Sequence, residues 1–134
     1  MKRSLLLLAF IPFLAFGGKE EREYMTSTLT PAVKAAEAAF QKACGCGLKV
    51  VVDEKTIKSK NEMYQAKNVS DSVTEGSAKY CTDDASKKAV CQLKTLKIGK
   101  DSETKFAFAG GTGTATTDGQ SYPSWDMMTP QLDK

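Results

Sequence analysis

The residues with the clearest capacity for chemistry are four cysteines, Cys44, Cys46, Cys81 and Cys91. Only one residue separates Cys44 from Cys46, so a bond between them would close a very small and strained ring. Pairing each of them with Cys81 or Cys91 avoids that strain and joins distant segments of the chain. The sequence therefore predicts two structural, non-local disulfides and leaves their connectivity open.

A redox role is the alternative for the first two cysteines. A strained Cys44–Cys46 disulfide would be easily reduced, and Cys81 and Cys91 would then form the structural bond. The pair lacks the Cys-x-x-Cys spacing of common redox motifs. We expect no metal site, because a one-residue spacing differs from that of zinc-binding cysteine pairs and export favours disulfides.

Acidic residues supply the second candidate chemistry, because the chain contains no histidine. The absence of histidine excludes Ser-His-Asp and Cys-His catalysis. A secreted hydrolase would need paired carboxylates, yet each candidate pair has a simpler role at a strand end, in a helix cap or in a turn. We therefore assign no catalytic residue and expect no cofactor. The candidate pairs are Asp53–Glu54, Asp83–Asp84 and Asp101 with Glu103.

Two further groups of residues could contact a partner. Thr112, Thr114 and Thr116 alternate along a predicted strand, where they could form a flat binding face or an ordinary solvated one. Trp125, Met127 and Met128 either close one end of the sheet or, if exposed, form a contact patch, since Trp and Met are common where partners bind.

The N-terminus predicts export. Lys2 and Arg3 precede an apolar run over 4–16, and small residues at 15 and 17 fit a signal-peptidase site. The run is shorter than the ~20 apolar residues that span a bilayer. We therefore expect a secretory signal at 1–17, a periplasmic or extracellular location, and no stable membrane insertion after cleavage.

Charge does not indicate a nucleic-acid partner. Without residues 1–17, the count of 19 Lys and Arg falls to 17 against 16 Asp and Glu, which leaves a net charge of about +1. The basic residues are scattered and do not alternate with aromatic ones. The expected partner is a protein or a small ligand of unknown identity.

Helices can be predicted from their end signals. A threonine–proline pair starts the first helix and a glycine ends it. A serine–glutamate capping box starts the second helix, and two aspartates cap a short third one. The expected ranges are about 30–44, 60–80 and 85–90, and residues 18–29 are expected to form a flexible lead-in.

Strands are predicted after the first and third helices. The valine-rich stretch 48–53 favours a strand buried on both faces at the centre of the sheet. Three further strands are expected over 93–98, 104–108 and 112–117, with Gly110–Gly111 as a hairpin turn.

The expected fold class is α+β, with residues 30–134 as a single domain. We predict an antiparallel sheet of about four strands, namely one strand after the first helix and a C-terminal three-stranded meander. Helices would cover one face, and two disulfides would stabilise the whole. The predicted function is a small exported binding or interaction module without catalytic activity. A thiol–disulfide redox protein and a carboxylate hydrolase are the alternatives.

Overall fold

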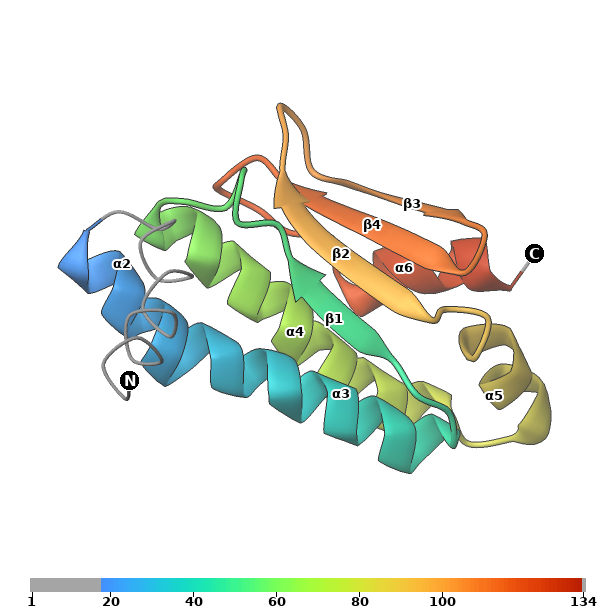
Figure 1. Ribbon diagram of the computed structural model, residues 1–134. Helices are drawn as coiled ribbons and strands as arrows, with labels where there is room; N and C mark the ends of the chain where they lie inside the picture. Colours follow the sequence, from blue (N-terminus) through green and yellow to red (C-terminus); the bar gives the residue numbers. More distant parts are fainter. Residues whose placement is uncertain (1–17, 134) are drawn as a thin grey trace, which may run out of the picture.

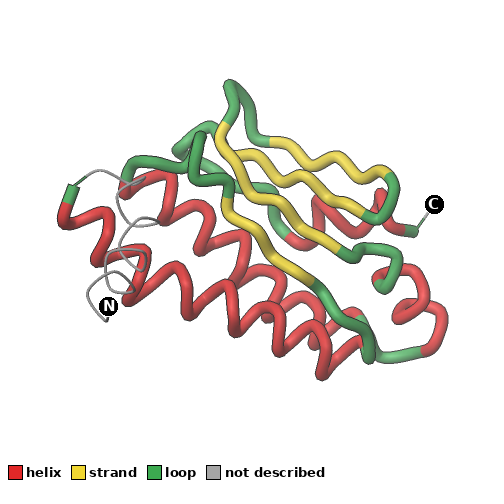
Figure 2. The backbone as a smooth tube through the Cα atoms, in the orientation of Figure 1, coloured by secondary structure: helices red, strands yellow, loops and turns green. Residues whose placement is uncertain are grey.

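The computed structural model describes residues 18–133, so the predicted signal segment 1–17 lies outside the described residues. The described chain forms two layers, a four-stranded sheet and a set of helices that cover one of its faces (Figures 1 and 2). The helical elements are α2 (Lys19–Tyr24), the π-helical turn η1 (Met25–Leu29), α3 (Thr30–Cys44), α4 (Lys60–Tyr80), α5 (Asp84–Val90) and α6 (Trp125–Leu132). The strands are β1 (Lys49–Val52), β2 (Thr95–Lys100), β3 (Lys105–Ala109) and β4 (Thr112–Thr117).

Three helix ends follow the predicted signals, whereas the predicted helix start at Thr30 and Pro31 is wrong, because η1 leads into α3 without a break. Gly45 ends α3 in the left-handed conformation, with φ of 79°. Ser59 and Glu62 form the predicted capping box at the start of α4, where each side chain accepts a hydrogen bond from the other residue's backbone N–H. Asp83 caps α5 by accepting a 2.8 Å hydrogen bond from the Ser86 N–H. These three boundaries confirm the predicted ones closely.

Residues 18–29 are expected to form a flexible lead-in, and in the structure residues 19–29 are helical. They form α2 and η1, which run without a break into α3 (Figure 1). Leu29 is fully buried, and Tyr24 and Met25 pack against the core. Burial of these side chains stabilises a helix whose sequence shows no clear apolar period.

The sheet is mixed, and the prediction of an antiparallel meander is wrong. Its strand order is β1-β2-β4-β3, in which β1, β2 and β4 are parallel and only β3 runs antiparallel to its neighbour β4. The helices α4 and α5 form a crossover that returns the chain to its starting end, so β2 runs parallel to β1. A sequence with one such crossover shows too little strand–helix alternation to reveal it.

The position of β4 explains the rest of the topology. Gly110 and Gly111 form the predicted tight turn between β3 and β4, with φ of 58° and 82°. The hairpin folds β4 back between β3 and β2, and β3 becomes an edge strand. β1 forms the other edge, which corrects the prediction that this valine-rich strand lies at the centre of the sheet.

The core lies between the sheet and the helices. Alternate residues of the strands point toward α3, α4 and α6, as expected for a sheet covered on one face. The buried residues of the sheet include Val50, Leu96, Ile98, Phe106 and Ala115, and those of the helices include Ala36, Phe40, Met63, Val69 and Val73.

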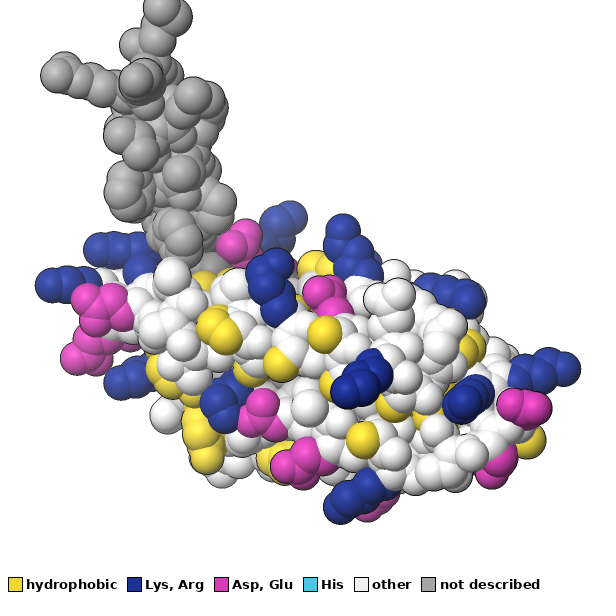
Figure 3. All heavy atoms as spheres, turned by 90° about the horizontal axis from the view of Figure 1, so that it is seen from below, with side chains coloured by type: hydrophobic (Ala, Val, Ile, Leu, Met, Phe, Trp, Pro, Cys, Tyr) yellow, Lys and Arg dark blue, Asp and Glu magenta, His cyan; other side chains and the backbone are white. Residues whose placement is uncertain are grey.

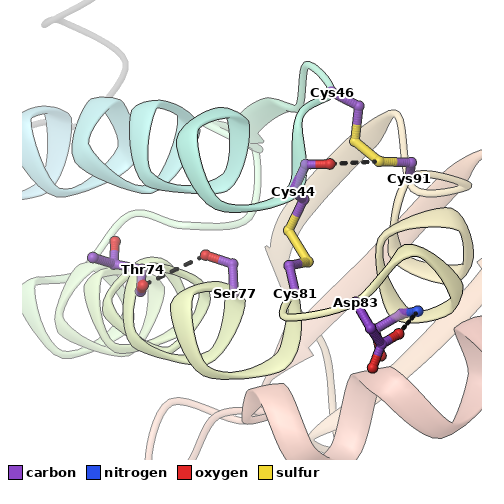
Figure 4. The surroundings of a disulfide bond; sticks show 8 residues. Cys44, Cys46, Thr74, Ser77, Cys81, Asp83 and Cys91 are labelled. Atoms are coloured by element: carbon purple, nitrogen blue, oxygen red, sulfur yellow. Dashed lines mark hydrogen bonds between the residues drawn. A yellow bond between two sulfur atoms is a disulfide. The ribbon is translucent and has the colours of Figure 1, made fainter.

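Two non-local disulfides join the ends of the helices, as predicted (Figure 4). Cys44 at the end of α3 bonds to Cys81 just after α4, and Cys46 bonds to Cys91 just after α5. The bonds span 37 and 45 residues of sequence. The chain-entropy model assigns loops of this size about 4 kcal/mol of stabilisation each.

Candidate functional site

One face of the sheet carries no helix among the described residues, and we call it the open face (Figure 1). The strand register groups its side chains into three rows that cross the sheet from β1 to β3. The rows begin at Lys49, Val51 and Asp53. In order, they comprise Lys49, Thr95, Thr112 and Ala109; then Val51, Lys97, Thr114 and Ala107; and then Asp53, Gly99, Thr116 and Lys105.

A cleft of about 520 Å³ lies on the open face, where β1, β2 and β4 end. Its floor is formed by the middle and last rows, including Val51, Lys97, Gly99 and Thr114, and its wall by residues 53–56 of the β1–α4 loop. In open sheets with parallel strands, ligands bind outside the carboxyl ends of the strands. The cleft occupies that position, and its volume suits a small organic molecule.

Hydrogen bonds hold the wall of the cleft in place. Asp53 accepts hydrogen bonds of 3.1 Å from the Lys55 N–H and from the Thr56 hydroxyl. The same hydroxyl oxygen of Thr56 accepts a 3.1 Å bond from the Lys100 N–H, which ties the loop to the end of β2. Ile57, the next residue, is fully buried and anchors the loop in the core.

Gly99 allows the loop to lie against the sheet. A Cβ at this position would lie 3.2 Å from Oγ1 of Thr56 and 3.7 Å from Cβ of Asp53. A larger residue would press on the loop, because both atoms belong to short side chains held by hydrogen bonds. The glycine therefore matters for the shape of the cleft.

The charges around the cleft differ in how fully they are paired. Within residues 18–133, the ammonium group of Lys97 forms no ion pair or hydrogen bond. Lys105 on the same face lies 3.7 Å from both Asp101 and Glu103. A hydrogen bond from the Ser102 N–H, followed by the charge of Lys105, lowers the pKa of Asp101.

The candidate catalytic acids lie in three separate loops. Asp53 and Glu54 line the cleft, but both oxygens of Asp53 accept hydrogen bonds within their own loop. Asp83 caps α5, and the hydrogen bond from the Ser86 N–H lowers its pKa. Asp101 and Glu103 lie between β2 and β3 and pair with Lys105 at the start of β3. The structure thus gives at least one acid of each pair a local role.

Cys44 and Cys46 belong to different disulfides, so the structure contains no Cys44–Cys46 bond. Figure 4 shows the two bonds side by side, with Sγ of Cys91 3.4 Å from the carbonyl oxygen of Cys44. A sulfur in a disulfide carries no hydrogen, so this is a van der Waals contact.

The predicted contact patch divides between the core and the surface. Trp125 and Met128 are 5% and 1% exposed, whereas Met127 is 46% exposed. The indole of Trp125 packs on Gly76 of α4 and makes an edge-to-face contact with Tyr80, with 6.1 Å between ring centroids. Partner binding at Met127 stays a prediction.

Among the predicted threonines, Thr114 has an exposed side chain and lines the cleft. Thr116 is 8% exposed, and its hydroxyl donates to the Glu103 carbonyl at 3.2 Å. Sequence reasoning missed Lys97 and Gly99. The alternation of Leu96 and Ile98 places both of them on the open face, but the cleft itself depends on the parallel pairing of β1 with β2.

At each edge of the sheet, a side chain forms hydrogen bonds with the backbone of the edge strand. At the β1 edge, Oε2 of Glu37 accepts a 2.8 Å hydrogen bond from the Val50 N–H. At the β3 edge, the Gln131 amide accepts from the Phe108 N–H at 3.2 Å and donates to the Phe106 carbonyl at 2.6 Å. One N–H of β1 and two backbone groups of β3 that could pair with another strand are thereby satisfied within the chain.

The side of the molecule on which α3 lies shows no large apolar patch (Figure 3). Basic and acidic side chains alternate there, and hydrophobic atoms occur in small separate groups. Scattered apolar atoms of this kind are normal on protein surfaces. Within residues 18–133, no helix is both long and apolar enough to cross a membrane.

The chain matches no protein-family model, and no curated protein or solved structure is detectably similar to it. Residues 18–133 also contain no group of three or more Cys, Asp or Glu side chains arranged to hold a metal ion. The function must therefore be argued from the geometry and chemistry of the site.

Proposed function

We propose that the protein is a small exported binding module that holds a small molecule in the cleft on its open face and leaves it chemically unchanged. The observation that carries this proposal is the position of the cleft on an uncovered sheet face, at the carboxyl ends of three parallel strands. Its volume of about 520 Å³ lies within the range of small-molecule sites.

The rest of the described surface supports the same choice. The helices cover one face of the sheet, and Glu37 and Gln131 occupy its two edges. The α3 side shows mixed charges and no broad apolar patch. The open face is therefore the part of the sheet best able to receive a ligand.

The polar side chains available to the cleft favour binding without catalysis. The chain has no histidine, and Asp53 in the cleft wall already accepts two hydrogen bonds within its loop. Export fits the signal-like N-terminus and the two disulfides, which persist in oxidising compartments.

The proposal is tested by a binding screen in which the amide NMR signal of each residue reports where a compound binds. Isotope-labelled protein is mixed with amino acids, sugars and small aromatic acids, amides and amines, and its amide NMR spectra are compared with those of the free protein. We expect at least one class of compound to shift the amides of Asp53, Gly99 and Thr114 together and to be recovered unchanged. Shifts confined to other surfaces, conversion of a bound compound, or no shifts with any class would overturn the proposal.

A further inference from the structure

The open face carries an excess of positive charge. Lys49, Lys97 and Lys105 are all exposed on it, and each belongs to a different row. Asp53 is the acidic residue of the three rows. Opposite charge in a ligand would complement this face.

The cleft itself has a small positive balance. Its lining contains three lysines and two acidic residues, which leaves a net charge of +1. The carboxylate of Asp53 accepts hydrogen bonds from Lys55 and Thr56, so it repels an incoming anion less than a free carboxylate would. The charged residues of the lining are Asp53, Glu54, Lys55, Lys97 and Lys100.

Three lysines line the cleft, namely Lys55, Lys97 and Lys100, and none of them forms an ion pair within residues 18–133; Lys97 is the one that belongs to the rows of the open face. It lies on β2 in the middle of the floor and forms no ion pair within the described chain. Lys105, by comparison, has Asp101 and Glu103 within 3.7 Å. Thr114, the partner of Lys97 in the register of β2 and β4, has an exposed side chain whose hydroxyl makes no hydrogen bond within residues 18–133.

These residues place a cation and a hydroxyl donor side by side, next to an apolar surface. Val51 lies opposite Lys97 on β1, and Gly99 leaves the floor beyond it without a side chain. Two donors match the two oxygens of a carboxylate. The lining contains no arginine among the described residues, although arginine is the residue best suited to phosphate.

We infer that the cleft binds a small monocarboxylate, whose carboxylate is held by the Lys97 ammonium and the Thr114 hydroxyl. The body of the ligand lies against Val51 and over Gly99. This inference rests on the proposed function, because it names the class of ligand for the same cleft. It commits to a single negative charge on a small, partly apolar molecule.

The test compares sodium benzoate, benzamide and inorganic phosphate at constant ionic strength. Benzoate and benzamide have nearly the same shape, but only benzoate carries a charge. Amide shifts of Gly99 and Thr114 report binding to the full chain. We expect benzoate to bind at least about tenfold more tightly than benzamide, the size expected for one charge-assisted hydrogen bond, and more tightly than phosphate.

Three substitutions identify the cation. K97Q removes the charge but keeps a long polar side chain, and it is expected to weaken benzoate binding about tenfold. K97R restores a charge and should restore most of the affinity. K105Q alters a lysine on the same face that lies outside the cleft lining, so it should bind benzoate as tightly as the unchanged protein.

The outcomes separate this inference from the proposed function. Equal binding of benzoate and benzamide, preferential binding of phosphate, or a K97Q protein that binds like the unchanged one would overturn the monocarboxylate assignment and leave the cleft as a binding site. If no compound in the wider screen shifts the cleft amides, the proposed function fails and the inference fails with it.

Discussion

Oε2 of Glu37 accepts a 2.8 Å hydrogen bond from the backbone N–H of Val50, so a side chain of α3 occupies the outer edge of β1. Val50 belongs to an edge strand whose outward N–H would otherwise be available to another chain. Gln131 plays the corresponding role at the β3 edge. The open face differs from these edges, because no helix among residues 18–133 covers it.

Removing the Glu37 carboxylate should expose the β1 edge. In E37A the Val50 N–H loses its partner, and we expect its amide hydrogen exchange to quicken about tenfold, together with stronger self-association. Hydrogen exchange by NMR and sedimentation at several concentrations measure the two effects. E37Q keeps an oxygen acceptor and is the matched control. If E37A exchanges and self-associates like the unchanged protein, the Glu37 carboxylate does not protect the Val50 N–H.

Alanine at position 76 should destabilise the protein, although Gly→Ala inside a helix usually stabilises by about 1 kcal/mol. The added Cβ would lie 2.2 Å from Cγ of Trp125, so α4 and α6 would have to move apart. Overpacking of this kind costs about 1–3 kcal/mol, which urea denaturation can measure.

A second background tests whether the Trp125 indole causes the loss of stability in G76A. In a W125L background the ring that meets position 76 is gone, so G76A should become neutral or stabilising. A loss of stability from G76A that is the same in both backgrounds would mean that Trp125 does not explain the glycine.

The two disulfides should contribute unequally to stability. Their loops are of similar size, so the chain-entropy model gives each about 4 kcal/mol. Cys44 and Cys81 are 3% and 6% exposed, however, whereas Cys46 and Cys91 are only partly buried. We therefore expect C44A/C81A to lower the free energy of unfolding more than C46A/C91A, by about 1–2 kcal/mol from the cavity left in the core.

Denaturation curves of the two double variants measure this difference, and peptide mapping of the oxidised protein checks the pairing itself. A larger loss from C46A/C91A would contradict the burial argument. Peptides linked in any other combination would contradict the connectivity.

Tyr80 should ionise well above the ordinary pKa of a tyrosine. Its hydroxyl donates to both oxygens of Asp133, at 2.7 and 2.5 Å, and this bond, followed by burial, raises the pKa of Tyr80 to about 12. Because the folded pKa exceeds the ordinary value of about 10, the stabilisation is complete below pH ~10 and is lost as the pH rises toward ~12.

Ultraviolet titration of tyrosine ionisation provides the measurement. One of the four tyrosines should titrate near 12, and D133N should return it toward the ordinary value of about 10. The stability advantage of the unchanged protein over D133N should also shrink with rising pH over the same window. Identical titration curves for the two proteins would show that Asp133 does not act on Tyr80.

Local features of the fold could be predicted because short-range chemistry determines them. Ser59 with Glu62, Asp83 and Gly45 define helix ends through hydrogen bonds or backbone conformation within a few residues. Gly110–Gly111 likewise defines a turn. The two non-local disulfides followed from the strain of the alternative bond between Cys44 and Cys46.

The order of the strands could not be predicted in the same way. Whether β4 or β3 lies beside β2 depends on contacts between residues far apart in sequence, and the alternation of Phe106 and Phe108 is compatible with either arrangement. The cleft could not be predicted for the same reason, because it exists only where the β1–α4 loop meets the ends of three parallel strands. The sequence alone therefore could not distinguish Lys97 from other lysines that point away from the core.

The most direct test of the central claim, that the cleft on the open face is the binding site, is the benzoate affinity of T114W compared with that of A109W. Thr114 and Ala109 are both exposed on this face, but only Thr114 lines the cleft. An indole at position 114 fills the floor beside Lys97, so benzoate binding measured by NMR titration should weaken at least about tenfold, while A109W binds like the unchanged protein. Equal affinity in T114W, A109W and the unchanged protein would contradict the claim.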